Sequence, residues 1–165
     1  MQSLENTMLI TDLDGTLLPA SKEISVADAA AISQFRAKGG KFAIATGRTL
    51  QAAQRYLKKL QPNIPVILFN GAAIYDPVAE KWLYTEELPP EAAAITRQVL
   101  EAFPDVSAEI LRTDGTYVSR MTPYEKEHLK ICQVEPILAM PEEIPHGWLK
   151  ALFAIAPERM PDLIA

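Results

Sequence analysis

Three short apolar runs in the first half of the chain limit its fold more than any other feature. They lie at residues 8–12, 42–46 and 65–69, and helix-like segments separate them. A continuous apolar run of this length is typical of a strand covered on both faces, and strands that alternate with helices build a parallel sheet. Because strand–helix–strand connections are almost always right-handed, the three strands should lie side by side and parallel. The sequence therefore predicts an α/β fold with the carboxyl ends of three strands at one rim.

Two helices are expected between these strands. Ser25 is a suitable N-cap for a helix that begins at Val26 and is ended by Gly39 and Gly40. A second helix is expected over residues 49–60, with a polar side rich in Lys and Arg. Residues 15–23 have no clear periodicity, which indicates a loop.

The second half of the chain has a different pattern. The expected elements are a hairpin over residues 73–84, a helix over 89–103, a hairpin around Asp114 and Gly115, a helix near 124–131, a strand over 149–155 and a helical start at Pro157. A proline-rich connection precedes the last strand. We place a domain boundary near Glu86, which gives a first domain of residues 1–85 and a second of residues 86–165.

Composition excludes several classes of protein. The 165 residues are 48% hydrophobic, enough for a real core, and the formal net charge of −5 argues against a nucleic-acid binder. The first residues, MQSLENT, lack the basic and apolar regions of a signal peptide, and no apolar run is long enough to span a bilayer. The single cysteine, Cys132, excludes an internal disulfide and is expected to be a small buried residue. We expect a cytoplasmic protein without membrane or nucleic-acid partners.

Two aspartates follow the first apolar run. In a strand, residues i and i+2 point to the same side, so the carboxylates of Asp12 and Asp14 should lie close together. Two such groups at the end of a buried strand repel each other unless a positive charge lies between them, and a hard divalent cation fits that place. Open α/β sheets bind ligands at this rim, where the strand ends place six small or polar residues: Asp12, Asp14, Thr46, Gly47, Asn70 and Gly71.

Three motifs in the same order resemble a known family. DLDGTLL begins at Asp12, ATGR at Ala45 and FNGA at Phe69. Their order and spacing are similar to those of the haloacid dehalogenase (HAD) superfamily of phosphotransferases, and within it to the Cof-type phosphatases with a large C2-type cap. The resemblance implies a Rossmann-like three-layer core with a parallel sheet, followed by a partial α+β cap domain.

The resemblance also implies a role for each motif residue. Asp12 would be the nucleophile that becomes an aspartyl phosphate, and Asp14 would be the general acid and base. Mg²⁺ would bind a carboxylate oxygen of Asp12 and the main-chain carbonyl of Asp14. The phosphoryl oxygens would be held by the Thr46 hydroxyl and by backbone amides around Leu13, Gly47 and Gly71. Asn70 and Arg48 complete the expected phosphate- or substrate-binding set.

Each motif also has a plain structural explanation. Aspartate and glycine favour turns, so DLDG can be a strand-to-turn junction, and Asn70-Gly71 is a common turn pair. Thr46-Gly47 can simply end a strand. Arg48 is either a phosphate or substrate contact or a solvated residue at a helix start. Residues outside the motifs are expected at the surface (His128 and His146) or in packing (Trp82 and Trp148).

Two later motifs of the resembled family, a lysine and an acidic GDxxND-like stretch, do not occur in the chain. Lys150 lies in the expected cap and does not take the lysine's role. We therefore expect a fragment or truncated product with weak or no activity of its own. Its DLDGT strand would show unpaired backbone groups on an apolar edge, which favours self-association.

Several functions are consistent with these patterns. The leading one is a magnesium-dependent phosphatase (phosphoric monoester hydrolase) that acts on small phosphorylated metabolites such as sugar phosphates. The alternatives are a sugar phosphomutase, and a catalytically incompetent HAD-like fragment or phosphate- or metal-binding module. A receiver domain is a distant alternative, because ATGR and the cap have no place in it.

Overall fold

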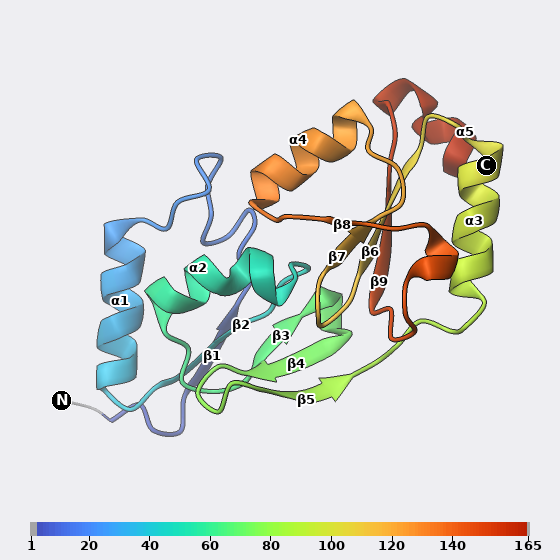
Figure 1. Cartoon of the computed structure of the whole chain (residues 1–165). Helices are drawn as coiled ribbons and strands as arrows, with labels where there is room; N and C mark the ends of the chain where they lie inside the picture. Colours follow the sequence, from blue (N-terminus) through green and yellow to red (C-terminus); the bar gives the residue numbers. More distant parts are fainter. Residues whose placement is uncertain (1–2, 165) are drawn as a thin grey trace. The chain divides into compact units, whose positions relative to one another are not determined.

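The computed structural model describes residues 3–164. The chain divides into two compact units between Glu86 and Glu87, coloured from blue to light green and from yellow-green to red in Figure 1. Each unit is described on its own. No helix within residues 3–164 is long and apolar enough to cross a membrane.

The first unit alternates strands and helices before it ends in a hairpin (Figure 1). Its elements are β1 (Met8–Thr11), α1 (Val26–Ala37), β2 (Lys41–Ile44), α2 (Leu50–Leu60), β3 (Val66–Leu68), the 3₁₀ helix η1 (Phe69–Gly71), β4 (Ala73–Asp76) and β5 (Lys81–Thr85). β1 and β2 form a parallel ladder, and a parallel bridge between Ala45 and Ile67 joins β2 to β3. β3, β4 and β5 are antiparallel. The parallel arrangement expected for the first three strands is confirmed.

The prediction that β1 is covered on both faces is wrong. The side chains of Met8, Leu9 and Ile10 are 56%, 41% and 47% exposed. β1 pairs with β2 alone, so within residues 3–164 it is an edge strand. By contrast, β2 has a paired neighbour on each side, and its Phe42 and Ile44 are fully buried.

Local hydrogen bonds explain where the helices of this unit begin. The hydroxyl of Ser25 accepts the amide of Asp28 at 3.0 Å, which confirms Ser25 as the N-cap of α1. The hydroxyl of Thr49 accepts the amide of Ala52 at 3.1 Å and caps α2 in the same way. One face of α2 is buried against the sheet, with Ala52, Ala53, Tyr56, Leu57 and Leu60.

The second unit is a four-stranded sheet with helices on both faces. Its elements are α3 (Ala92–Ala102), β6 (Ser107–Leu111), β7 (Thr116–Val118), α4 (Pro123–Cys132), β8 (Ile137–Leu138), η2 (Pro141–Glu143), β9 (Lys150–Ala154), η3 (Pro157–Arg159) and α5 (Met160–Ile164). The strand order is β8-β7-β6-β9. The short strand β8 lies in the segment expected to be a proline-rich connection.

The alternation of side chains along β6 separates the two helical layers. Ala108 and Ile110 belong to an apolar cluster that includes Leu100 of α3 and Trp148. The intervening residues face α4 instead, because Ser107 donates to Glu125 at 2.8 Å and Glu109 pairs with His128 at 3.3 Å. α3 and α4 therefore cover opposite faces of this sheet (Figure 1).

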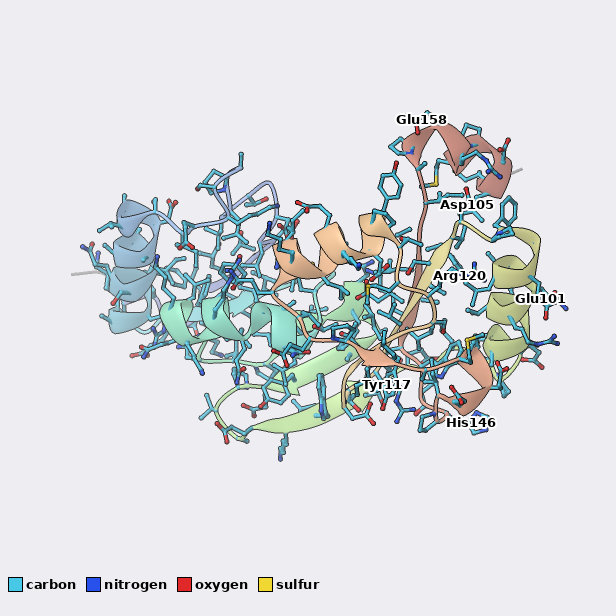
Figure 2. The ribbon with its side chains drawn as sticks, turned by 45° about the horizontal axis from the view of Figure 1, so that its top comes forward. Glu101, Asp105, Tyr117, Arg120, His146 and Glu158 are labelled. Atoms are coloured by element: carbon cyan, nitrogen blue, oxygen red, sulfur yellow. The ribbon has the colours of Figure 1, made fainter. Side chains whose placement is uncertain are left out.

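Arg120 ties α3 to the sheet of the second unit (Figure 2). Its guanidinium donates to the carbonyls of Leu100, Phe103 and Val106 at 2.9–3.0 Å. Leu100 lies in the last turn of α3, where carbonyls lack helical partners. One arginine thus provides hydrogen-bond donors for a carbonyl at the end of α3 and for two carbonyls of the connection that follows.

Two expectations for the second unit need correction, and one holds. Cys132 is half-buried rather than buried, and its sulfur lies 3.6 Å from Nε2 of His128. His128 is not a plain surface residue, because it also pairs with the buried Glu109. Trp148 is a packing residue as expected, being 5% exposed.

Candidate functional site

The segment after β1 turns back on itself and leaves Asp12 exposed. Leu13 is completely buried, and its carbonyl accepts the amide of Leu18 at 2.7 Å. Gly15 has φ +77°, a conformation that glycine adopts without a steric penalty. The amide of Leu13, expected to bind phosphate, donates to Oδ1 of Asp12 at 2.7 Å. This bond fixes the Asp12 carboxylate beside the end of β1.

The carboxylate of Asp14 lies between two cations. Arg48 binds it through both oxygens, with Nε to Oδ2 at 2.7 Å and Nη2 to Oδ1 at 2.9 Å. Lys22 Nζ lies 2.8 Å from Oδ1. The hydrogen bonds from Arg48, and then those from Lys22, lower the pKa of Asp14 to about 2. Asp14 is therefore fully ionised at neutral pH in this arrangement.

Main-chain bonds join the ends of the second and third strands at the same rim. The hydroxyl of Thr46, which is 5% exposed, accepts the Arg48 amide at 3.3 Å. The carbonyls of Thr46 and Arg48 accept the amides of Asn70 and Phe69, at 3.2 and 3.1 Å. Together with the Asp14–Arg48 pair, these bonds bring the three motif segments to one place. Gly47 lies between Thr46 and Arg48 in this arrangement.

The turn after β3 has an unusual backbone. Phe69, Asn70 and Gly71 all have positive φ, at 52°, 58° and 102°. For a bulky residue such as Phe69 this conformation is an outlier that the surroundings must hold in place. Its ring is 2% exposed and lies 6.1 Å from that of Trp82, so Trp82 packs as expected. The strained turn leaves Asn70 and Gly71 exposed at the rim.

Lys22 and Tyr56 were not expected at the site. Lys22 follows Asp14 by eight residues and has φ 56°. Its carbonyl accepts the hydroxyl of Tyr56 at 3.1 Å, and the Tyr56 ring lies 5.2 Å below the guanidinium of Arg48. A lone lysine in an aperiodic loop carries no sequence signal for such a pairing. The helical pattern of α2 predicts that Tyr56 is buried. It does not predict the hydrogen bond from Tyr56 to Lys22.

The oxygen atoms at the rim suit a hard cation. A carboxylate oxygen of Asp12 and the main-chain carbonyl of Asp14 are ligands of the kind that Mg²⁺ prefers. Within residues 3–164, no group of three His, Cys, Asp or Glu side chains is arranged to hold a metal ion. The Asp14 side chain is already engaged by Arg48 and Lys22. The described residues thus offer two oxygen ligands that suit Mg²⁺, the carboxylate of Asp12 and the main-chain carbonyl of Asp14.

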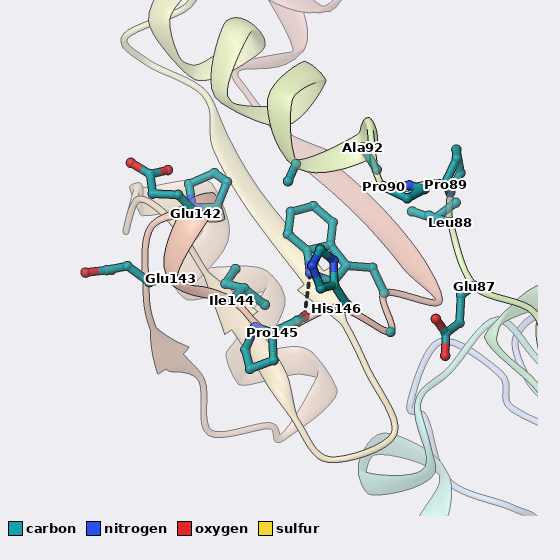
Figure 3. A pocket seen from close by; sticks show the side chains of 14 residues that line it. Glu87, Leu88, Pro89, Pro90, Ala92, Glu142, Glu143, Ile144, Pro145 and His146 are labelled. Carbon is teal, nitrogen blue, oxygen red and sulfur yellow. Dashed lines mark hydrogen bonds between the residues drawn. The ribbon is translucent and has the colours of Figure 1, made fainter.

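A separate cavity of about 490 Å³ lies in the second unit (Figure 3). Trp148 lies among its lining residues, with the indole N–H donating to the carbonyl of Pro145 at 3.0 Å. Glu87, Glu142 and Glu143 also line it. Three carboxylates repel a phosphorylated ligand, so this cavity does not share the chemistry of the rim.

The rim thus combines the exposed carboxylate of Asp12 with the carboxylate of Asp14, which is held by two cations. The buried hydroxyl of Thr46 and backbone polar groups lie at the same strand ends. A model of the haloacid dehalogenase-like hydrolases matches residues 9–147, and the chain belongs to that family. The family expected from the three motifs is confirmed.

Individual relatives are phosphatases. The 5-amino-6-(5-phospho-D-ribitylamino)uracil phosphatase YitU of Bacillus subtilis is 30% identical over 125 residues, which cover 74% of this chain and 44% of that protein. The HMP-PP phosphatase of Cronobacter sakazakii is 33% identical over 99 residues, which cover 60% of this chain and 35% of that protein. The chain thus spans less than half the length of each.

The fold is also shared with solved structures. A haloacid dehalogenase-like hydrolase from Bacteroides thetaiotaomicron superposes with a TM-score of 0.84 at 17% identity, covering 95% of this chain and 61% of that one. The likeness extends through both units and confirms the α/β fold class, a Rossmann-like core followed by an α+β part.

Proposed function

We propose that this chain provides the core site and part of the cap of a magnesium-dependent phosphatase acting on small phosphorylated metabolites. Residues 1–85 would form the core and residues 86–165 the cap. The observation that carries the proposal is the rim itself, where an exposed carboxylate of Asp12 lies beside Asp14, Arg48 and Lys22. An anionic phosphate is attracted to the two cations, and a carboxylate nucleophile stands at the same strand end.

Asp12 is the proposed nucleophile. Its Oδ1 is fixed by the Leu13 amide at 2.7 Å, which orients the carboxylate. In the first step, an Asp12 oxygen forms a bond to phosphorus while the bond from phosphorus to the substrate oxygen breaks. In the second step, water attacks the aspartyl phosphate, the Asp12 carboxylate is released, and inorganic phosphate leaves. A bound Mg²⁺ supplies positive charge that offsets repulsion between the two anions.

Asp14 is the proposed acid and base. Held by Arg48 and Lys22, it is a carboxylate suited to accept a proton from the attacking water. Proton donation to the leaving oxygen needs its protonated form, which is disfavoured while both cations are in contact. We infer that a substrate phosphate draws Arg48 away from Asp14 and so raises the Asp14 pKa in the complex.

The remaining motif residues are proposed to bind the phosphoryl oxygens. The Thr46 hydroxyl accepts the Arg48 amide and keeps its own hydrogen to donate. The backbone amides of Gly47 and Gly71 can approach an anion closely, because neither residue has a side chain. Asn70 is exposed beside them. The Leu13 amide can donate to a phosphoryl oxygen only after its hydrogen bond to the Asp12 carboxylate breaks.

Sugar phosphates and similar small metabolites are the proposed substrates. The names of the two relatives refer to small phosphorylated compounds, and the YitU substrate carries a phosphorylated ribityl group. These names describe those proteins, and they support the same class of substrate here.

The test is phosphate release from a panel of sugar phosphates, with Mg²⁺ and with a chelator. Because the two later motifs of the family do not occur in the chain, we expect weak release. It should depend on Mg²⁺, fall to background in Asp12→Asn, and fall by about 10²-fold or more in Asp14→Asn. Asp162→Asn, an exposed carboxylate paired only with Arg159, is the matched control. A phosphorylated isomer as the product would favour a phosphomutase. Phosphate binding without turnover would favour a binding module.

A further inference from the structure

A second cavity, of about 400 Å³, lies in the first unit. Its lining comes from the end of α1, the length of α2, the loop before β3 and the turn between β4 and β5. None of the motif residues lines it. Its lining is mixed, with the cations Arg36 and Lys58 beside apolar and aromatic side chains.

Neither cation has a carboxylate partner. No Asp or Glu side chain within residues 3–164 lies within 4.0 Å of the charged groups of Arg36 or Lys58. Arg36 makes one long hydrogen bond, from Nη1 to the carbonyl of Leu60 at 3.3 Å. Its Nε is buried and has no hydrogen-bond partner among the described residues. A half-buried guanidinium with so few partners favours an anion beside it.

The lining also includes apolar and aromatic side chains. Leu57 is 8% exposed, and the ring of Tyr75 packs edge-on against Trp82 with centroids 5.0 Å apart. Pro77 and Val78 belong to the same lining. Such surfaces suit an aromatic or alicyclic body.

The walls are held by hydrogen bonds that do not depend on a ligand. Oδ1 of Asp76 accepts the amides of Val78 and Ala79 at 2.9 and 3.0 Å, which fixes the turn between β4 and β5. Asn63 fastens the loop before β3, accepting the Phe42 amide at 2.7 Å and donating to the Gly40 carbonyl at 3.0 Å. The cavity is therefore formed before any ligand arrives, which lowers the entropy cost of binding.

We propose that this cavity binds a small organic anion with a flat apolar body and a single acidic group. Arg36 and Lys58 hold the acidic group, and the body lies against Leu57 and Tyr75. Glu80 also lines the cavity, so two positive charges face one negative charge. The net charge of +1 matches a monoanion. This site is independent of the phosphatase proposal.

The test uses the aromatic carboxylate naphthoate, titrated into the 165-residue chain and followed by the backbone amide signals of the NMR spectrum. We expect shifts at Leu57, Gln61 and Tyr75 and none at residues 12–15. Arg36→Met and Lys58→Met should each weaken binding, Arg36→Met by about tenfold or more, since it removes a hydrogen-bonded charge. Lys58 is exposed, so its variant keeps the fold. The matched control is Lys38→Met, an exposed cation outside the cavity, which should bind as the unmodified chain does.

Four results would overturn the proposal, and three of them concern where and how naphthoate binds. They are shifts at the rim in place of the cavity, equal affinity for the uncharged analogue naphthylmethanol, and unchanged binding by both Arg36→Met and Lys58→Met. An absence of any shift at millimolar naphthoate would also contradict it.

Discussion

At the scale of single residues, the ionisation of Asp14 is set by its two neighbours. Arg48 makes the largest contribution, through two hydrogen bonds, and Lys22 adds one more. The Arg48 side chain is 9% exposed, whereas that of Lys22 is 38% exposed. Water screens Lys22 more, so the two cations are not equivalent.

We expect the pKa of Asp14 to rise from about 2 in both Arg48→Met and Lys22→Met, and to rise further in Arg48→Met. The measurement is a carbon-13 NMR titration of the aspartate carboxyl groups without metal. Lys38→Met, which removes an exposed cation with no ion pair among the described residues, should leave the titration unchanged. Equal curves for all three variants would contradict this assignment.

The sequence predicted some of these residues better than others. Asp12, Asp14, Thr46 and Asn70 follow apolar runs, so strand topology alone placed them at one rim. Arg48 was left open between a ligand contact and a solvated residue, and the structure pairs it with Asp14. Lys22 could not be predicted, because its position depends on how the loop after β1 folds back.

At the scale of elements, α4 is attached to its sheet through polar contacts. The carboxyl of Glu125 is almost fully buried, and burial raises its pKa. Ser107 donates to it at 2.8 Å. His128 contacts Cys132 and Glu109, which raise its pKa to about 10. The packing of α4 thus depends on the protonation states of these side chains as well as on burial of its apolar Leu129, which is 6% exposed.

The His128 contacts make stability depend on pH in a defined direction. The folded pKa lies above the unfolded value of 6.5, so the contribution is complete below pH 6.5 and is lost as the pH rises toward about 10. His128→Gln should therefore reduce the free energy of unfolding at pH 6 more than at pH 10. The difference should be about 1 kcal/mol or less, since solvent screens a side chain that is 44% exposed.

Urea unfolding at the two pH values measures this effect. His146→Gln, at the other histidine of the chain, is the control and should show no such difference. A His128→Gln effect that is the same at both pH values would contradict the role given to the protonated ring.

The N-cap of α2 is a further element-scale feature, because α2 starts directly after the rim. Thr49→Ala removes the acceptor of the Ala52 amide, and we expect it to cost about 1 kcal/mol of folding free energy. Thr49→Ser keeps the hydroxyl and should cost less. Chemical denaturation measures both, and equal losses would show that the methyl group rather than the cap matters.

Element prediction failed where tertiary context decides. The apolar run of β1 indicates a strand covered on both faces, but Met8, Leu9 and Ile10 are exposed. The unpaired edge of β1, by contrast, was expected and is confirmed within the described residues. β8 has two residues, too few for a periodic signal. α1 began at its expected N-cap residue, and both hairpins formed at their expected turn residues.

At the scale of the whole molecule, β1 presents an apolar edge within the described residues. Met8, Leu9 and Ile10 are each more than 40% exposed, and unpaired strand groups lie beside them. Edges of this kind pair with other chains unless charge prevents it.

We therefore expect the 165-residue chain to self-associate as its concentration rises. Ile10→Lys should shift association to higher concentration by placing a charge on the edge. Analytical ultracentrifugation measures this, with Val26→Lys as the control at an apolar site that is 85% exposed on α1. A monomer at all concentrations, or equal effects of both variants, would contradict the edge as the cause.

The central claim is that Asp12 takes the phosphoryl group. Borohydride reduces an aspartyl phosphate to homoserine, so an acid-quenched turnover of a sugar phosphate, reduced and digested, can be read by mass spectrometry of the peptide that contains residue 12. We expect homoserine at position 12 when substrate and Mg²⁺ are present, and none in Asp12→Asn. An unmodified Asp12 with phosphate released, or label on another residue, would contradict the account.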